Sequence, residues 1–239
     1  MRLRSILAIV FLIGYAVFVK QVSAQTLNRS VYLDPFFGGK ENGPLVAHNV
    51  SAKDITLEVS QKLKQQLEKK SIGTILSRDR DKFVNLDQRV MMERSHGTNA
   101  YIAINVSKTK KDCIQLYFSR QTQSEPQKEK QNVRELEGTV NALLLEKKVK
   151  RSGQLAEAIY GSIKQSSVPL CLEKQMWTDD SNYDINYVVE NAHSPVVIID
   201  FGVSDVMASY VLDAAIMDKI IRSVSEGINE YLAASQSHK

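Results

Sequence analysis

A glycine-rich turn at residues 33–43 follows a short β-rich run, which is a common setting for a catalytic or metal-binding loop. The loop reads LDPFFGGKENG, and such a site would need nitrogen, oxygen or sulfur atoms near its centre. Phe36 and Phe37 stand there instead, and neither side chain can bind a metal or act as a nucleophile. Two uses remain for the loop: the Phe37 ring fills a cavity, or it forms the floor of a binding site.

Histidine and cysteine side chains elsewhere in the chain do not have metal-ligand spacing. His48 and His193 could in principle supply ligand nitrogens, but neither has a suitably spaced partner, and we expect both to be surface histidines. Cys113 and Cys171 are the two cysteines, and they could pair in an oxidising compartment. Their spacing leaves that pairing open.

The first 24 residues have the pattern of a secretory signal peptide. Two arginines precede an apolar stretch of about fifteen residues, which is shorter than a membrane-spanning helix. The small-residue pattern VSA ends at Ala24, and no cysteine follows it to carry a lipid anchor. We expect the mature chain, residues 25–239, to leave the cytoplasm without a membrane span. A signal segment that stays uncleaved as an anchor is the alternative.

The charge balance gives no reason to expect a nucleic-acid partner. The chain has 31 basic and 27 acidic residues, but Arg2, Arg4 and Lys20 lie in the predicted signal peptide. The mature chain is therefore close to neutral. Its length suits one domain with a substantial core.

Apolar periodicity predicts alternating strands and helices. We expect strands at 30–34, 74–76, 100–106, 113–119, 187–189 and 195–202. We expect helices at 53–70, around 86–91, at 132–150, at 154–164 and along 216–232, with irregular structure at 168–186 around Trp177. Ser51 and Asp54 have the spacing of a capping box. The pattern predicts an α/β fold, a single domain with a twisted, mainly parallel sheet flanked by helices.

The segment at about 120–152 differs from the rest of the chain. Its first part, RQTQSEPQKEKQ, is charged and interrupted by proline, as in a loop or linker. Its second part has apolar residues on one helical face. This insertion is either an extra packed helix with a solvent loop or a helix that docks on a protein partner.

Several phrases, taken in order, resemble the zinc-dependent N-acetylmuramoyl-L-alanine amidases, which cut the bond between sugar and stem peptide in the bacterial cell wall. They are VYLDPFFGGK, KDITLEVSQKLKQQLEKK, ILSRDRDKFVNLDQRV, SHGTNAYIAINVS, QLAEAI and SPVVIIDFGVSD, and they extend from about Val31 to Leu232. The resemblance implies a single α/β domain of the zinc-amidase (phosphorylase/hydrolase-like) type. In some cell-division amidases a helix inserted at the place of 120–152 covers the active site until an activator displaces it.

The resemblance also implies which positions would hold the family's zinc and its general base. The three zinc-ligand positions are Phe37, Ala52 and Asn105, and the general-base glutamate position is Asp200. Phenylalanine and alanine offer no lone pair, and a neutral amide oxygen is a poor zinc ligand. We therefore expect no metal and no cofactor, because the family zinc and its hydrolytic mechanism are lost.

The polar residues of this region have other conceivable roles. Asn105 and Asp200, with Asp34 or Glu41, could form an oxygen site for a hard cation, but hydrogen bonding between them is the simpler expectation. Two arginines, Arg78 and Arg89, could either form structural ion pairs or bind a ligand. Arg78 and Arg89 are expected to pair with Asp79, Asp81 or Asp87, although an exposed arginine could hold a stem-peptide carboxylate.

The sequence thus favours a catalytically inactive, amidase-like protein of the bacterial cell envelope, secreted across the inner membrane and periplasmic or wall-associated. Its expected partners are peptidoglycan fragments or an envelope protein, the latter through the helix at 131–149. Candidate binding residues are Phe36, Phe37, Asn105, Asp200 and Arg78. Two alternatives remain: an active amidase with a non-standard site that uses His48, Asp200 or Glu41, and a structural component of an envelope assembly.

Overall fold

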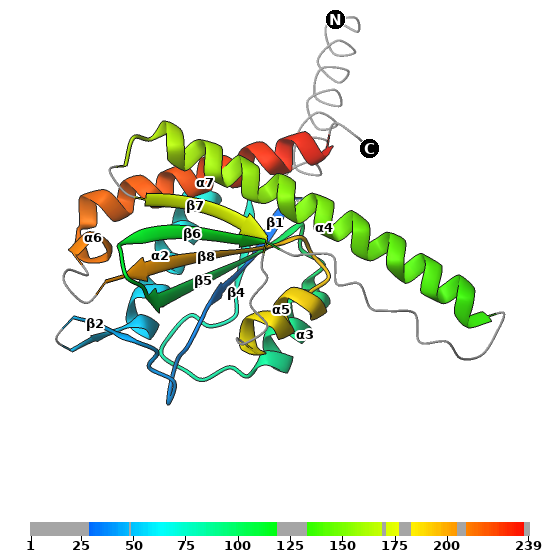
Figure 1. Cartoon of the computed structure of the whole chain (residues 1–239), viewed down its shortest axis with the longest axis horizontal. Helices are drawn as coiled ribbons and strands as arrows, with labels where there is room; N and C mark the ends of the chain where they lie inside the picture. Colours follow the sequence, from blue (N-terminus) through cyan, green and yellow to red (C-terminus); the bar gives the residue numbers. More distant parts are fainter. Residues whose placement is uncertain are drawn as a thin grey trace, which may run out of the picture.

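The computed structural model describes residues 29–47, 49–118, 133–168, 171–176, 183–204 and 209–236. Its centre is a six-stranded sheet in the order β4-β1-β5-β8-β6-β7 (Figure 1). Neighbouring strands are parallel except β6 and β8, which run antiparallel. The strands are β1 (Ser30–Pro35), β4 (Gly73–Leu76), β5 (Ala100–Lys108), β6 (Cys113–Phe118), β7 (Cys171–Met176) and β8 (Val196–Val203), and β2 (Leu45–Ala47) and β3 (Val50–Ser51) form a separate pair.

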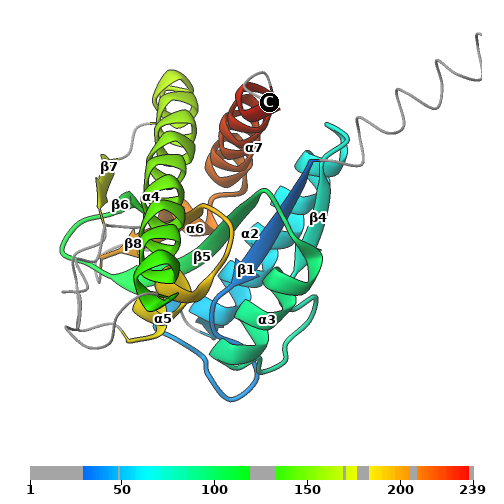
Figure 2. The same cartoon turned by 90° about the vertical axis from the view of Figure 1, so that its right-hand side faces the viewer.

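Helices cover both faces of the sheet (Figure 2). Its central strands are therefore apolar on both sides. One core lies under α2, α4 and α7, and the other lies under α3 and α5. The helices are α2 (Ala52–Glu68), α3 (Leu86–His96), α4 (Val133–Gln165), α5 (Tyr183–Asn191), α6 (Ser209–Leu212) and α7 (Ala214–Gln236). The predicted single α/β domain with a mainly parallel sheet is confirmed.

The predicted capping box starts α2. The Asp54 carboxylate accepts hydrogen bonds from the Ser51 backbone N–H at 3.0 Å and from the Ser51 hydroxyl at 2.6 Å. Ser51 is extended and ends the β2–β3 pair, so this cap fixes where the chain changes from strand to helix. It thereby holds Ala52, the first residue of α2, close to the loop that follows β1.

The strand predicted at 187–189 is wrong, because these residues lie in α5. Val188 and Val189 pack into the core under α3 and α5, together with Ala192. Their β-branched side chains favour strands only weakly, and burial against the sheet decides the conformation. The irregular structure predicted at 168–186 is likewise wrong in part, because β7 adds an edge strand there; Trp177 lies outside the described residues.

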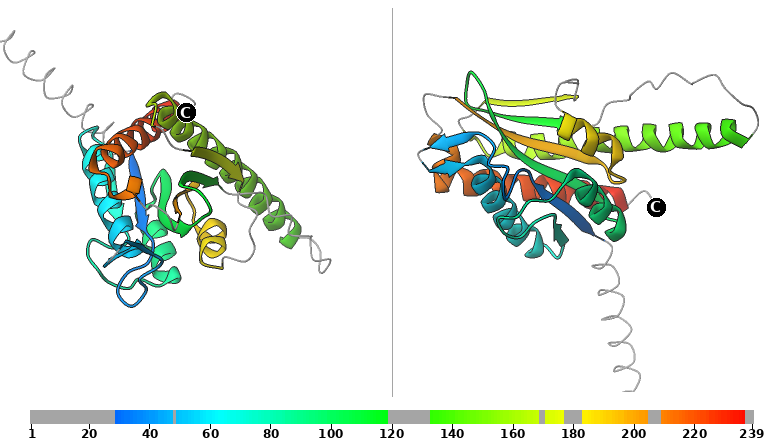
Figure 3. Two further views of the ribbon diagram at one scale, coloured as in Figure 1. Left: turned by 60° about the vertical axis from the view of Figure 1, so that its left-hand side comes forward. Right: turned by 90° about the horizontal axis from the view of Figure 1, so that it is seen from below.

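Two separate helices were expected between 132 and 164, but α4 is continuous from Val133 to Gln165. Gly153 lies inside this helix without interrupting it, and a β-carbon placed on it would lie 3.6 Å from the ring of Phe118, an ordinary van der Waals contact. The end of α4 near Val133 extends beyond the sheet in the two views of Figure 3, whereas the later turns pack on β6, β7 and α7. The predicted loop at 120–131 lies outside the described residues.

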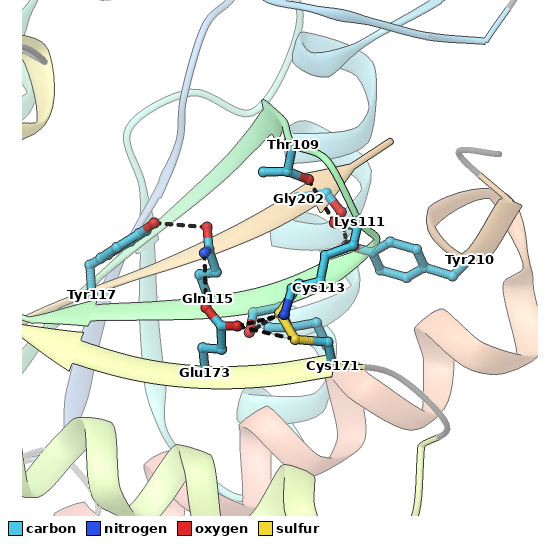
Figure 4. Close-up of a disulfide and its surroundings, with 10 residues drawn as sticks. Thr109, Lys111, Cys113, Gln115, Tyr117, Cys171, Glu173, Gly202 and Tyr210 are labelled. Carbon is cyan, nitrogen blue, oxygen red and sulfur yellow. Dashed lines mark hydrogen bonds and ion pairs between the residues drawn. A yellow bond between two sulfur atoms is a disulfide. The ribbon is translucent and has the colours of Figure 1, made fainter. Parts of the chain in front are cut away.

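A disulfide joins Cys113 of β6 to Cys171 of β7, a pairing that the sequence left open (Figure 4). The two residues are direct partners in the parallel register, with Cα atoms 4.4 Å apart. Beside the sulfur atoms, Lys111 Nζ and Glu173 Oε1 form an ion pair of 2.9 Å. The disulfide therefore attaches the edge strand β7 to the rest of the sheet.

Within the described ranges, none of the helices has both the length and the apolar character needed to cross a bilayer. The predicted signal peptide, residues 1–24, lies outside those ranges.

Candidate functional site

The predicted site residues gather where the parallel strands β1, β5 and β8 end. The Phe36 backbone N–H donates to the carbonyl of Ile104 at 3.0 Å, which sets the loop after β1 beside Asn105. Asn105 is in turn the register partner of Asp200. Carboxyl ends of parallel strands are the usual ligand-binding edge of α/β folds. The structure thus brings Phe36, Phe37, Asn105 and Asp200 to one edge of the sheet.

Phe37 and Ala52 fill the space between the loop and α2. A β-carbon placed on Gly43 would lie 2.8 Å from the Phe37 ring and 2.7 Å from Ala52 Cβ, so both side chains press on the same glycine. Phe37 itself has a φ of 65°, in the left-handed region that non-glycine residues rarely adopt. An aromatic ring and a methyl group therefore occupy these two positions, and neither offers a metal an electron pair.

Asn105 and Asp200 form a buried hydrogen-bonded pair, as the sequence suggested. Asn105 Nδ2 donates to Asp200 Oδ1 at 3.1 Å, and the Ser107 hydroxyl donates to Asp200 Oδ2 at 2.6 Å. Burial raises the pKa of Asp200 to about 6, although the hydrogen bonds from Ser107 and Asn105 act in the opposite direction. Both carboxylate oxygens are thus already used by protein donors.

Asp34 lies in β1 directly before the loop, and its side chain is fully buried. Its carboxylate accepts from the hydroxyls of Ser77 and Tyr101 and forms an ion pair with Arg89. Burial, followed by the Asp34 charge, raises the pKa of Tyr101, so the phenol stays protonated and donates. Because these donors take its oxygens, Asp34 does not join Asn105 and Asp200 in an oxygen site.

Arg78 and Arg89 hold the backbone of the loop. Arg78 Nε donates to the Pro35 carbonyl at 3.1 Å, and Arg78 Nη2 donates to the Phe36 carbonyl at 3.1 Å. Arg89 donates to the carbonyls of Pro35 and Phe37 at 3.1 and 3.3 Å. These contacts hold the backbone of the loop in place from Pro35 to Phe37.

The ion pairs predicted for the two arginines are wrong in their partners. Arg89 pairs with Asp34, whereas Arg78 is 1% exposed and donates to backbone carbonyls and the Thr56 hydroxyl. The three predicted acids lie elsewhere: Asp81 pairs with Lys53 at 2.9 Å, Asp87 accepts from Tyr187, and the Asp79 carbonyl accepts from Gln61. Arg78 is also too buried to reach a ligand carboxylate.

A cleft of about 370 Å³ opens beside this edge, between the loop and the start of α3. Aromatic side chains form much of its wall: Phe36, Phe37, Phe83 and Tyr187. Glu41 and Asp87 add two carboxylates, and the buried Arg89 lies behind them. Sequence reasoning missed Phe83 and Tyr187; the signal for Phe83 was a lone aromatic residue in a polar stretch, KFVN.

Metal-binding groups are otherwise sparse in the described part of the chain. One cluster of three candidate ligand side chains occurs there, Cys113, Cys171 and Glu173, and its two sulfur atoms are joined in the disulfide. His193 is exposed and lies near the amino ends of the strands, away from the Phe37 loop. His48 lies outside the described residues. The side chains at the family's zinc positions therefore do not fit a zinc site.

The α/β fold of this chain is shared by solved cell-wall amidases. N-acetylmuramoyl-L-alanine amidase AmiC2 of Nostoc punctiforme superposes with a TM-score of 0.66 at 17% identity, over 86% of this chain and 98% of that one. The CwlD amidase of Clostridioides difficile, solved in complex with the GerS lipoprotein, gives 0.63 at 19% identity, over 87% and 100%. Because the two structures are only 17% and 19% identical to this chain in sequence, the superpositions show a shared fold and no more.

The family model described as N-acetylmuramoyl-L-alanine amidase matches residues 31–230, and the chain belongs to this family. A relative in Bacillus subtilis (strain 168), the uncharacterized protein YqiI, is 25% identical over 159 residues, which is 65% of this chain and 74% of the relative. The resemblance read from the sequence is thereby confirmed at the level of the family.

Proposed function

We propose that this protein is a catalytically inactive member of the amidase family that binds peptidoglycan fragments in the bacterial cell envelope. The observation that carries the proposal is the packing of Phe37 and Ala52 against Gly43 where the resemblance calls for zinc ligands. The remaining ligand position, Asn105, is tied to Asp200 by a hydrogen bond. Without a metal to acidify water, a carboxylate alone is a weak catalyst of amide hydrolysis.

The aromatic cleft is the part of the site that would bind the ligand. Aromatic walls provide large contact areas, and a few polar groups fix the orientation of a small ligand. Phe37 and Phe83 would contact the apolar face of a sugar or a peptide side chain. Glu41 and Asp87 would attract an amino group of the stem peptide. Phe37, which stands where the resemblance implies a zinc ligand, also lines this cleft, and this supports binding without cleavage.

Metal content and hydrolysis test the loss of catalysis. Purified protein, loaded with zinc and then dialysed, should retain far less than one zinc per chain and should release no peptide from cell-wall material. An active amidase of the family serves as the positive control. Stoichiometric zinc together with cleavage would establish the alternative, an active amidase with a non-standard site, and loss of that cleavage in Asp200→Asn would assign the base.

Co-sedimentation with insoluble peptidoglycan tests the binding role. Phe83 is 40% exposed and lines the cleft, so Phe83→Ala should weaken binding without unfolding the protein. Met91 is 68% exposed on α3 outside the cleft, and Met91→Ala is the matched control. Equal retention of both variants would place binding elsewhere, and no retention of the wild type at physiological salt would end the peptidoglycan proposal.

A protein partner is a second candidate, favoured by the exposed leucines of α4. Leu143 and Leu144 are 60% and 59% exposed on the part of α4 within the predicted interface at 131–149. The CwlD structure, in which an amidase is bound to a lipoprotein, supports such a role for the fold. Cross-linking in extracts should give an adduct that Leu143→Asp/Leu144→Asp abolishes and Glu146→Gln/Lys147→Gln preserves. The same adduct in both variants would exclude this surface.

The envelope location rests on the predicted signal peptide. Secretion across the inner membrane should yield a mature protein that begins at Gln25, which N-terminal sequencing of the native protein can establish. A protein that still begins with the leader and sediments with membranes would favour the anchored alternative.

A further inference from the structure

The amino ends of the parallel strands border a second cavity, of about 630 Å³, at the opposite edge of the sheet from Phe37. Arg29, Asn99 and Pro195 line it, and they directly precede β1, β5 and β8. Arg151 of α4 and the end of α7 close its sides. This cavity shares no residue with the aromatic cleft, so a ligand here is independent of the proposed function.

Two arginines give the cavity a positive charge, and no acidic residue in the described part of the chain forms an ion pair with either of them. Arg29 Nη2 donates to Asn229, at 2.6 Å to its side-chain oxygen, whereas Arg29 Nε is buried and has no hydrogen-bond partner among the described residues. No described residue forms a hydrogen bond or ion pair with the Arg151 guanidinium. Arg151 and Tyr231 both line the cavity. Burial raises the pKa of the Tyr231 phenol, and the hydrogen bond with Ser235 and then the Arg151 charge oppose that shift.

Glu93 is the acidic residue of the cavity lining, and its carboxylate is engaged elsewhere. Its oxygens accept from the backbone N–H groups of His193 and Ser194, both at 3.0 Å, and from the Ser194 hydroxyl at 2.5 Å. Glu93 is fully buried, and its oxygens are therefore directed at the turn before β8. The arginine donors remain for another acceptor.

We propose that the Arg29–Arg151 cavity binds a small anion that carries a carboxylate or phosphate group. Guanidinium groups match both groups by paired, charge-assisted hydrogen bonds. The Thr98 and Ser194 hydroxyls line the polar side, and Tyr231 and Leu232 offer an apolar wall for the body of the ligand. A buried guanidinium nitrogen without a partner is costly, and a bound oxygen would satisfy it.

Calorimetric titration of the full chain with inorganic phosphate and, separately, with glutarate tests the proposal. At constant ionic strength, at least one of the two probes should bind saturably. The probe that binds more tightly identifies phosphate or carboxylate as the preferred group. Arg151→Gln should weaken that binding about tenfold or more, the effect of losing a charge-assisted contact. Arg222→Gln, which changes an exposed arginine on α7 outside the cavity, should leave it unchanged.

A second variant separates binding from folding. Arg29→Lys keeps a charge but loses the planar fork, and it should weaken the same titration while the circular dichroism spectrum stays native. The proposal is overturned if neither probe binds saturably to the wild type, or if folded Arg151→Gln binds both probes as tightly as the wild type.

Discussion

Asn105 donates a hydrogen bond to Asp200 across neighbouring strands, at 3.1 Å, where the amidase resemblance assigns a zinc ligand and the general base. The pair is buried and closed on itself, since Ser107 takes the other carboxylate oxygen. Because the Asp200 carboxylate is buried, its protonation state changes the stability of the fold. Its energetics can therefore be measured without any substrate.

Replacing Asp200 by asparagine should stabilise the protein at neutral pH. Burial raises the pKa of Asp200 to about 6, so between about pH 4 and 6 the folded state binds more protons than the unfolded state. Stability from this group therefore falls as the pH rises through that range, by up to about 3 kcal/mol. Urea unfolding from pH 4 to 8 should show this loss in the wild type and not in Asp200→Asn. Parallel curves would contradict the assignment.

Replacing Asp34 by asparagine should destabilise the protein strongly. Asp34 compensates the buried Arg89, and removing it leaves an unpaired charge in the core, at a cost of about 3–5 kcal/mol. Guanidinium chloride unfolding measures the loss. Glu68→Gln, which breaks the exposed pair with Lys64, is the control and should cost less than about 1 kcal/mol. Similar costs for the two variants would mean that Asp34 is not a buried ion-pair partner.

Replacing Gly43 by alanine tests the plug formed by Phe37 and Ala52. Gly43 has a φ of 65°, and an added β-carbon would overlap both neighbouring side chains. The strain of an alanine in the left-handed backbone region and the overpacking together should lower the free energy of unfolding by about 2–4 kcal/mol. Gly161 lies in α4, where a β-carbon meets nothing within 4 Å, so Gly161→Ala should instead gain up to about 1 kcal/mol. If Gly43→Ala is neutral, the ring of Phe37 does not fill this space.

Opening the disulfide between Cys113 and Cys171 should destabilise the fold. Cys113 and Cys171 are separated by 58 positions, and chain-entropy arguments give about 4 kcal/mol for a loop of that length. Cys113→Ser/Cys171→Ser and reduced wild-type protein should show the same lower Tm in scanning calorimetry. A reductant that leaves the wild-type Tm unchanged would show that the bond does not form in solution.

The α/β class and most elements could be predicted from the sequence, because apolar period and capping are local signals. The run at 100–106 is apolar at every position, as a strand covered on both faces requires, and Ser51 with Asp54 marked the start of α2. The strand predicted at 187–189 failed because Val188 and Val189 are buried by neighbours that are distant in the chain. Local propensity has no information about such contacts.

The sequence by itself determined which atoms stand at the candidate site: rings at Phe36 and Phe37, a methyl group at Ala52, a neutral amide at Asn105. Side-chain chemistry is a property of residue type, and no fold can give a phenyl ring a zinc-binding electron pair. Only the tertiary structure decided what these residues contact. The pairing of Arg89 with Asp34, the Cys113–Cys171 bond and the cleft shared by Phe83 and Tyr187 all join segments far apart in the chain, and register and packing alone bring such segments together.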